Sequence, residues 1–432
     1  MTFSETSQHV LEDIVVYPKG TLLHLALISP PFKSHIAVFE AVGAELVRRG
    51  HSVTFVLNAG AERYVAEEHR VCAVKGTDAR EMERVIDRAS RPSGLFGVLR
   101  TVHDMVMLTD ALCEYAPEHL RALSIDAVLG DQMEPAAGLL ARHLGIPIIS
   151  IACALPIERD ETIPLPFLPW LYDSSPKGIR RNRGGERVSR LLLLEQNRAI
   201  RKWSRRFGFG ETFHDLQSCL SDVATIAQTT VGFDFPRASA TSRLHMVGPL
   251  REEEREEDIP FDIDPAKPFV FMSLGTLQGH RRSLFAAAAR VCRELDVQLL
   301  VAHCGGLDRK QAEVLGATWV VDFAPQRAVL ARADLCITHC GMNTVMDALE
   351  FGTPLLALPI AFDQPGVSAR IVHHGVGLRL STRLLTTGKM ERAIGTLLSE
   401  PGYKKRAGEI GRTISAAGGL RKAADIIEAA II

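Results

Sequence analysis

The sequence is poor in the features that mark disulfide-stapled, zinc-binding or nucleic-acid-binding proteins. Its 432 residues include 8 cysteines, which are scattered without the paired short spacings of a zinc site or a disulfide framework. The formal net charge is −1, so there is no basic excess of the kind that binds DNA or RNA. These absences predict reduced, packed thiols, no metal site and no nucleic-acid partner.

Long apolar runs and a secretion signal are also absent. The apolar stretch 146–157 is shorter than the roughly 18 residues that a membrane-spanning helix needs, and Pro147 and Pro156 interrupt it. Residues 1–20 lack the basic start and the apolar run of a signal peptide. We therefore expect a cytoplasmic protein in which residues 1–20 form a poorly ordered extension.

The sequence has enough hydrophobic residues to form the cores of two domains. Its length exceeds what one hydrophobic core usually supports, and 46% of its residues are hydrophobic. Strand-helix-strand patterns at 22–57 and 127–151 predict a parallel sheet in the first half. After the acidic stretch 251–258, strands alternate with helices again between residues 269 and 358. We expect two doubly wound sheets with a boundary near residue 255.

The most informative segment is 338–344, with the sequence THCGMNT. An apolar strand leads into its glycine-containing turn and a helix follows, so free backbone amides and the positive helix end face one point, which binds anions. His339, Asn343 and Thr344 add side-chain donors there. Asp347, one turn on, offers an acceptor suited to the hydroxyls of a ribose. The pattern predicts a site for a nucleotide diphosphate sugar.

A second loop of small residues, Ser273-Leu274-Gly275-Thr276, follows another predicted strand and lets backbone amides approach a phosphate. Taken singly, these side chains have structural explanations: His339 as a core histidine, Asn343 as a helix cap, Asp363 as a turn residue and Phe323 as a core ring. However, small or hydrogen-bonding residues follow five strand ends in this half, where open α/β sheets bind ligands. We therefore expect one shared site.

The segment from Phe323-Ala324-Pro325-Gln326 through 338–344 and Gly352-Thr353-Pro354 to Asp363-Gln364 resembles the donor-binding motif of family 1 glycosyltransferases. These are UDP-sugar-dependent enzymes of the GT-B fold. The resemblance implies an α/β protein with two doubly wound, Rossmann-like domains facing across a cleft. The implied parts are an acceptor-binding domain at 21–250, a linker at 251–267, a UDP-sugar-binding domain at 268–412 and a C-terminal helix at 413–432 that crosses back to the first domain.

Three positions depart from the family pattern. Phe323 stands where the family has a tryptophan that stacks on uracil, Met342 replaces another tryptophan, and Asp347 replaces a glutamate that binds the ribose. Asp363 and Gln364 are implied to hold sugar hydroxyls, and the glutamine favours glucose, so the expected donor is UDP-glucose. The implied donor-binding set is Ser273, Gly275, Thr276, Phe323, Ala324, Gln326, His339, Gly341, Met342, Asn343, Thr344, Asp347, Asp363 and Gln364.

His35 is the expected catalytic base. An imidazole has a pKa suited to taking the proton of an attacking hydroxyl, and His35 lies in the loop after the first strand, where the family keeps its catalytic histidine. Asp131 ends a neighbouring strand and matches the aspartate that orients this histidine. Glu134 is a rival carboxylate. The local alternatives are a helix N-terminal residue for His35 and a helix cap for Asp131.

The resemblance implies a single displacement with inversion, which gives a β-glucoside without a covalent intermediate. Amides near Gly275 and Gly341, together with His339, would stabilise the departing UDP in place of a metal. The segment 262–264 has the Asp-X-Asp pattern that binds metal in the other major glycosyltransferase fold, but it stands beside Pro265 in the linker. We interpret it as a turn and expect no cofactor.

A closer resemblance concerns the acceptor. Blocks at 30–35, 131–136 and 273–280 are similar to those of bacterial zeaxanthin glucosyltransferases, which implies a carotenoid acceptor that is glucosylated at its ring hydroxyls. The expected acceptor contacts are Phe32, Met133, Glu134, Phe167 and Trp170. The segment 163–172 would supply an apolar rim for a long acceptor.

A basic segment suggests how such an acceptor would be reached. Residues 173–210 hold eleven Lys and Arg but three Asp and Glu. Six apolar residues fall roughly on one helical face, namely Val188, Leu191, Leu192, Ala199, Trp203 and Phe207. The stripe predicts either peripheral contact with the inner face of the membrane through 163–207 or a helix that packs on its own domain.

Three alternatives share parts of these patterns. A family 1 enzyme that acts on a macrolide, a flavonoid or a sterol would keep the same donor residues. A UDP-sugar epimerase is disfavoured by the His35 loop, and a catalytically silent UDP-sugar-binding protein is disfavoured by the presence of both His35 and Asp131. The sequence leaves the acceptor and the oligomeric state open.

Overall fold

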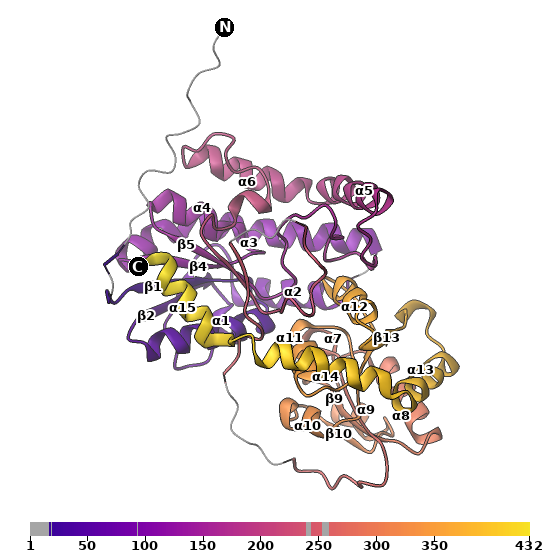
Figure 1. Ribbon diagram of the computed structural model, residues 1–432. Coiled ribbons are helices and arrows are strands. Elements are labelled where there is room, and N and C mark those ends of the chain that lie inside the picture. The colour runs from indigo at the N-terminus through magenta and orange to yellow at the C-terminus, as the bar shows by residue number, and fades with distance from the viewer. Residues whose placement is uncertain (1–16, 19, 93, 239–242, 253–258) are drawn as a thin grey trace.

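Two parallel β-sheets, one in each half of the chain, form the framework of the protein (Figure 1). The computed structural model describes residues 17–18, 20–92, 94–238, 243–252 and 259–432. All strand pairings among these residues are parallel, and helices lie on both faces of each sheet. The expectation of two doubly wound sheets is confirmed.

The first sheet has seven strands in the order β3-β2-β1-β4-β5-β6-β7. They are β1 (His24–Ile28), β2 (Ser52–Asn58), β3 (Val71–Val74), β4 (Ala127–Asp131), β5 (Ile148–Ala152), β6 (Thr225–Ala227) and β7 (Leu244–Met246). Every residue of β4 and β5 is buried, because helices cover both faces. The strand order reverses between β1 and β4, so the ligand-binding switch point lies beyond the carboxyl ends of these two strands.

The second sheet has six strands in the order β10-β9-β8-β11-β12-β13. They are β8 (Phe269–Ser273), β9 (Gln298–Ala302), β10 (Trp319–Val321), β11 (Leu335–Thr338), β12 (Leu355–Ala357) and β13 (Gly377–Arg379). Here the order reverses between β8 and β11. Ser273 pairs with Thr338 in the register of these strands, so both loops that carry small residues leave the sheet at the same level.

Helices connect successive strands. In the first domain they are α1 (Lys33–Arg48), α2 (Ala79–Ser90), α3 (Gly94–Ala122), α4 (Pro135–Leu144), α5 (Pro176–Leu192) and α6 (Leu194–Arg206). In the second they are α7 (Gly275–Gln278), α8 (Arg282–Glu294), α9 (Arg309–Glu313), α10 (Gln326–Arg332), α11 (Met342–Glu350), α12 (Gln364–His373), α13 (Thr387–Ser399) and α14 (Pro401–Ser415). α4 shows the local logic: the Glu134 side chain caps it, Pro135 begins it, and Gly145, with φ of 68°, ends it.

The helix α15 (Gly419–Ile431) follows the second domain in the chain but lies against α1 of the first (Figure 1). Its apolar face completes the first hydrophobic core through Ala423, Ala424, Ile427 and Ile431. On its polar side, Arg49 Nη1 lies 2.7 Å from Asp425 and 2.8 Å from Glu428. The two domains are therefore linked by the chain twice.

The apolar stripe at 188–207 does not share one exposed face. Ala199 and Trp203 are buried, and α6 packs along α3, where Lys202 pairs with Asp110 at 3.1 Å. For Ala199 and Trp203 the structure supports the second alternative, a helix that packs on its own domain, because the 29-residue helix α3, which the sequence patterns did not reveal, covers them. Val188 and Leu191 alone of this stripe remain strongly exposed, at 57% and 70%. No helix in the described parts of the chain is both long and apolar enough to span a bilayer.

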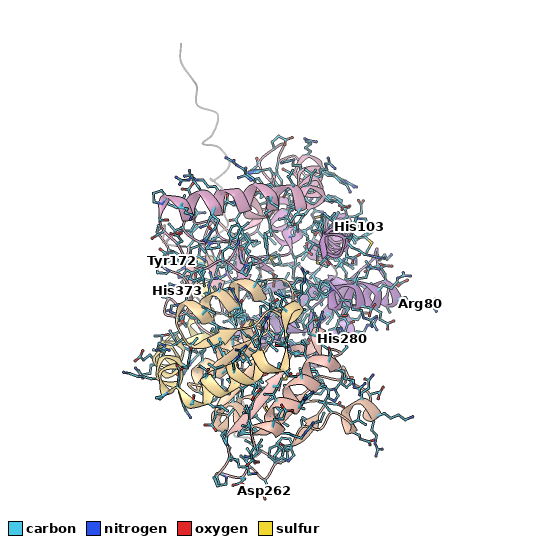
Figure 2. All side chains as sticks on the ribbon, turned by 90° about the vertical axis from the view of Figure 1, so that its right-hand side faces the viewer. Arg80, His103, Tyr172, Asp262, His280 and His373 are labelled. Atoms are coloured by element: carbon cyan, nitrogen blue, oxygen red, sulfur yellow. The ribbon has the colours of Figure 1, made fainter. Side chains whose placement is uncertain are left out.

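The predicted linker is partly packed. Its residues 253–258 lie outside the described residues, but Ile259, Phe261 and Ile263 pack against the core of the second domain. Asp264 accepts a hydrogen bond from the backbone of Ala266 at 2.9 Å, as a turn residue does. Figure 2 shows Asp262 at the end of the second domain that points away from the first.

The predicted N-terminal extension, residues 1–20, lies mostly outside the described residues. Within it, the backbone N–H of Tyr17 donates to the carbonyl of Ile431 at 3.2 Å, and the Tyr17 hydroxyl lies 3.3 Å from Asp126. Tyr17 is therefore held against the first domain and α15.

Candidate active site

His35 and Asp131 meet at the switch point of the first sheet. His35 lies in the first turn of α1, after β1, and Asp131 ends β4. His35 Nδ1 lies 2.7 Å from Asp131 Oδ2, and the other carboxylate oxygen accepts the backbone N–H of Met133 at 2.8 Å. The buried carboxylate thus keeps a proton on Nδ1, which leaves Nε2 to accept another.

The charges near His35 keep it basic. Burial lowers the pKa of His35, but the charge of Asp131, the hydrogen bond with it and the charge of Asp363 outweigh burial, so the pKa lies above its ordinary value. Cys153 lies beside the pair, and ligand atoms of the three residues fall within 4.8 Å of one another. Burial raises the pKa of the Cys153 thiol well above its ordinary value, so the thiol stays neutral.

Asp363 brings the second domain to this pair. Its Oδ2 accepts the backbone N–H of Leu155, in the first domain, at 3.2 Å. Burial raises the pKa of Asp363, and the charge of His35 opposes that effect. The Phe32 ring lies 5.8 Å from the His35 ring and 6.1 Å from that of Phe362. A base and a carboxylate from opposite domains thus share one partly apolar site.

Gln364, the other residue expected to bind the sugar, stabilises the turn that presents Asp363. Its Oε1 accepts the backbone N–H groups of Ile360 and Ala361 at 2.9 Å and 2.8 Å. Its side-chain amide N–H groups are not used in these two bonds. They are the part of Gln364 that can donate to a sugar hydroxyl.

Two glycines hold the His339 ring between the loops after β8 and β11. A Cβ at Gly275 or at Gly341 would lie 2.7 Å from His339 Cε1, so any larger residue would displace the imidazole. Burial lowers the pKa of His339 to about 4, which makes the ring neutral. Its Nδ1 is buried and has no hydrogen-bond partner among the described residues, which is the state of a group that a ligand or water satisfies.

Backbone strain gathers at the same edge of the second sheet. Cys304, Cys340 and Phe362 have positive φ values of 53°, 73° and 55°, and they follow β9, β11 and β12. A non-glycine residue in this conformation costs about 1–3 kcal/mol and persists where the surrounding structure imposes it. Such residues cluster at ligand sites, in agreement with the donor site predicted here.

The residues expected to bind the ribose form a connected group. Thr344 Oγ1 donates to Gln326 Oε1 at 3.2 Å, and Gln326 Nε2 donates to Asp347 Oδ2 at 2.6 Å. Arg251 lies 2.6 Å from the other oxygen of Asp347, and burial raises the pKa of this carboxyl while Arg251 opposes the rise. Asp347 is 5% exposed, so its contact with a ribose stays a prediction. Glu350 also pairs with Arg251.

Two of the remaining donor residues, Asn343 and Phe323, contact the first domain. Asn343 Oδ1 accepts a hydrogen bond from Gln228 Nε2 of the first domain at 2.8 Å. Phe323 is 61% exposed, as a stacking platform requires, and Lys33 Nζ lies 5.3 Å from the centre of its ring. Among the others, Thr276 is exposed, Ala324 is half-buried, and Ser273 and Met342 are buried.

The expected acceptor residues differ in their surroundings. Met133 and Phe167 are exposed at 38% and 39%, whereas Phe32 is buried. Trp170 packs on α5, where the Arg181 guanidinium lies 5.1 Å from its ring centre. Glu134 is buried, accepts the Thr109 hydroxyl at 2.8 Å, and has a pKa that burial raises to about 7. The apolar rim therefore consists of Phe167 more than of Trp170.

The segment with this rim also touches the second domain. The backbone N–H of Gly366, just after the residues expected to bind the sugar, donates to the carbonyl of Pro166 at 2.9 Å. Tyr172 lies beside His373 of α12 (Figure 2), and the centres of the two rings are 5.7 Å apart. The rim segment is thus tied to the helix that follows Asp363.

Three residues outside the predicted set contact Asn343, Asp363 and Asp347, namely Gln228, Leu155 and Arg251. Gln228 directly follows β6, so the rule that polar residues at strand ends line the site could have found it. The Leu155 contact uses a backbone amide, and Arg251 comes from the linker. Neither has a local sequence signal.

Comparisons with known proteins identify the family of the chain. Residues 25–413 match the family described as UDP-glucoronosyl and UDP-glucosyl transferase. The chain belongs to this family. It is 42% identical over 413 residues to a zeaxanthin glucosyltransferase of Pantoea ananas, with 94% of this chain and 95% of the relative covered. A zeaxanthin glucosyltransferase of Pseudescherichia vulneris is 38% identical, with 94% and 98% covered.

The fold agrees with that of solved glycosyltransferases. The crystal structure of the glycotransferase of kitacinnamycin superposes with a TM-score of 0.75 at 21% identity, covering 96% of this chain and all of that one. This likeness shows the fold, which is GT-B. The protein is thus a glycosyltransferase of the UDP-dependent family, as the motifs at 323–326 and 338–364 predicted.

Proposed function

We propose that this glycosyltransferase moves glucose from UDP-glucose to a ring hydroxyl of a carotenoid such as zeaxanthin, with inversion at the anomeric carbon. The observation that carries the proposal is the 2.7 Å contact between His35 and Asp131, facing Asp363 of the other domain. A base from the first domain and a carboxylate from the predicted donor loop of the second domain therefore face the same space. This is the arrangement that a direct transfer between two bound substrates requires.

The proposed reaction is a single displacement. The acceptor hydroxyl gives its proton to His35 Nε2 while its oxygen forms a bond to the anomeric carbon. The bond from that carbon to the β-phosphate oxygen breaks, and its electron pair leaves with UDP. Attack opposite to UDP converts the α-linked glucose into a β-glucoside. The Asp131 carboxylate stabilises the imidazolium until the proton passes to water.

The departing UDP is proposed to be stabilised without a metal. The start of α11 and the loop after β8 supply backbone N–H groups and the positive end of a helix dipole at one point. The neutral His339 ring, fixed by Gly275 and Gly341, can add a hydrogen bond. These donors are preorganised for the charge that grows on the β-phosphate.

The proposed acceptor rests on the relatives and on apolar surface near the base. The two relatives named zeaxanthin glucosyltransferases align with nearly the whole of this chain. Met133 follows Asp131 by two residues, Phe362 precedes Asp363, and both side chains are exposed by more than a third. They would flank an apolar molecule whose hydroxyl reaches His35. A macrolide, flavonoid or sterol remains the alternative acceptor.

We further propose peripheral contact with the inner face of the membrane, where a carotenoid resides. The contact surface, here called the α3–α5 surface, consists of Leu95, Phe96, Val188 and Leu191, exposed at 58%, 84%, 57% and 70%. Ion pairs between α3 and α6 hold these helices side by side and bring the start of α3 toward the end of α5. Exposed arginines on α5, including Arg180 and Arg187, suit anionic headgroups.

The deciding experiment combines purified protein, UDP-glucose and zeaxanthin in detergent micelles. We expect zeaxanthin glucosides with the β-configuration by NMR, release of one UDP per glucose, and the same rate with a chelator. His35→Ala should lower kcat about 100- to 10,000-fold but leave the Kd for UDP unchanged. An unchanged kcat would refute His35 as the base.

Other outcomes would favour the alternatives. Turnover on a macrolide, flavonoid or sterol but not on zeaxanthin would refute the carotenoid acceptor. Conversion of UDP-glucose into another UDP-hexose without UDP release would indicate an epimerase. UDP binding with no turnover on any alcohol would indicate a silent binding protein.

A further inference from the structure

Lys33 reaches from the first domain to the donor side of the cleft. It begins α1, two residues before His35, and its side chain is exposed. Its Nζ lies 5.3 Å from the centre of the Phe323 ring in the second domain. Phe323 is the residue proposed to stack on the base, so the Lys33 ammonium lies where the donor must enter.

The charge of Lys33 also acts on Cys304, in the loop after β9. Burial raises the pKa of the Cys304 thiol, while a hydrogen bond with Ser273 and the positive charge of Lys33 lower it. Cys304 Sγ lies 3.8 Å from Ser273 Oγ, in the loop expected to bind phosphate. The ammonium therefore lies near the Phe323 ring and also acts on a thiol that contacts the first residue of the predicted phosphate-binding loop.

The other basic side chains that contact predicted donor residues are neutral or already paired. His339 is neutral, because burial lowers its pKa to about 4. Arg251 pairs with Asp347 at 2.6 Å, and Arg327 pairs with Glu350 at 2.5 Å. Among the described residues, no carboxylate lies within ion-pair distance of Lys33. Lys33 thus carries a positive charge that a diphosphate can use.

We propose that Lys33 is a donor-binding residue that crosses the cleft and binds the diphosphate of the nucleotide sugar. A base that stacks on Phe323 displaces the ammonium from the ring, and the long side chain turns toward the diphosphate oxygens. The ammonium then offsets the negative charge that grows on UDP as the sugar leaves. This inference rests on the proposed function, since it assumes a UDP-sugar at this site.

The test compares Lys33→Met, Lys33→Arg and the control Lys405→Met by calorimetry with uridine, UMP and UDP. Lys405 is an exposed lysine on α14, beside the amino ends of the strands and so at the opposite edge of the second sheet. Lys33→Met should weaken UDP binding about 10- to 100-fold, as expected for loss of a charge-assisted hydrogen bond, and leave uridine binding unchanged. Lys33→Arg should retain most of the affinity, and Lys405→Met all of it.

Two further readouts separate charge from packing. The dependence of log Kd for UDP on log salt should be shallower in Lys33→Met than in the wild type. In turnover, Lys33→Met should lower kcat as well as raise the KM for UDP-glucose, because the charge on UDP increases during transfer. Both effects should be largely absent in Lys33→Arg.

Several results would overturn the inference. If Lys33→Met binds UDP as tightly as the wild type, or weakens uridine and UDP equally, Lys33 does not bind the diphosphate. If Lys405→Met weakens UDP to the same extent, the effect is general electrostatics. A wild-type protein that does not bind UDP at all would instead refute the proposed function.

Discussion

Asp234 and Arg370 form an ion pair across the boundary between the domains, 2.6 Å apart, with each side chain only 1% exposed. Arg237 lies 2.9 Å from the other oxygen of Asp234 and adds a second cation. Arg370 belongs to α12, which begins directly after Asp363. The pair therefore fixes the helix behind the loop that is predicted to bind the sugar against the first domain.

Asp234→Asn should destabilise the protein strongly, because it leaves the buried Arg370 guanidinium without its carboxylate. Removing one partner of a buried ion pair costs about 3–5 kcal/mol. Urea unfolding, followed by circular dichroism, measures the effect. The matched control is Arg309→Met, which breaks an exposed pair with Glu313 and should cost less than about 1 kcal/mol. If both variants lose the same free energy of unfolding, burial does not decide the strength of these ion pairs.

The pH dependence of turnover should report the raised pKa of His35. The base must be neutral to accept a proton, so kcat/KM should begin to fall, as pH decreases, at a pH above the ordinary histidine value of about 6.5. Asp131→Asn removes a charge that raises this pKa, so the fall should move to lower pH. The maximal rate should also drop by about 100-fold or more. If kcat/KM falls at the same pH in the wild type and in Asp131→Asn, His35 is not the group that titrates.

Glu134→Gln should change how stability depends on pH. Burial raises the pKa of Glu134 to about 7 in the folded protein from 4.5, so the folded state binds the proton more tightly than the unfolded state. Stability must then decrease as pH rises from about 4.5 to 7, by up to about 3 kcal/mol. The glutamine cannot ionise. We expect the melting temperatures of the wild type and the variant to agree near pH 4.5, and the variant to be more stable at pH 8. If the melting temperatures of the two proteins change with pH in the same way, the prediction is wrong.

The α3–α5 surface can be tested with vesicles of anionic and neutral lipids. The double variant Leu95→Ser, Phe96→Ser should bind anionic vesicles about 30-fold more weakly, because two apolar side chains that enter the bilayer each contribute on the order of 1 kcal/mol. Leu384→Ser, at a residue 67% exposed in the second domain, is the control and should bind normally. Turnover of a detergent-solubilised acceptor should be unchanged in both. A wild type that does not sediment with vesicles would refute the membrane proposal.

Much of the fold and site could be predicted from local sequence. Strands in a doubly wound sheet end at one edge, so polar or small residues after successive strands must lie near each other. This rule places Gly275 beside His339 and His35 beside Asp131, as the structure has them. The family could be predicted because the residues after these strands resemble the donor-binding motif of family 1 glycosyltransferases.

Contacts between distant segments could not be predicted. The residues Ala199 and Trp203 have the spacing of an interfacial helix, and only the presence of α3 decides that they face inward. Arg251 and Asp347 are separated by most of the second domain in sequence, and no periodicity or propensity relates them. Such contacts depend on how segments that are distant in sequence pack together, which a local pattern does not record.

The position of α15 has a consequence for biosynthesis. Its apolar side chains belong to the core of the first domain, yet the ribosome makes them only after the whole second domain. Until then α1 presents an uncovered apolar face, so the earlier domain cannot complete its packing as it emerges. A nascent chain stalled between α14 and α15 should therefore recruit chaperones to its first domain.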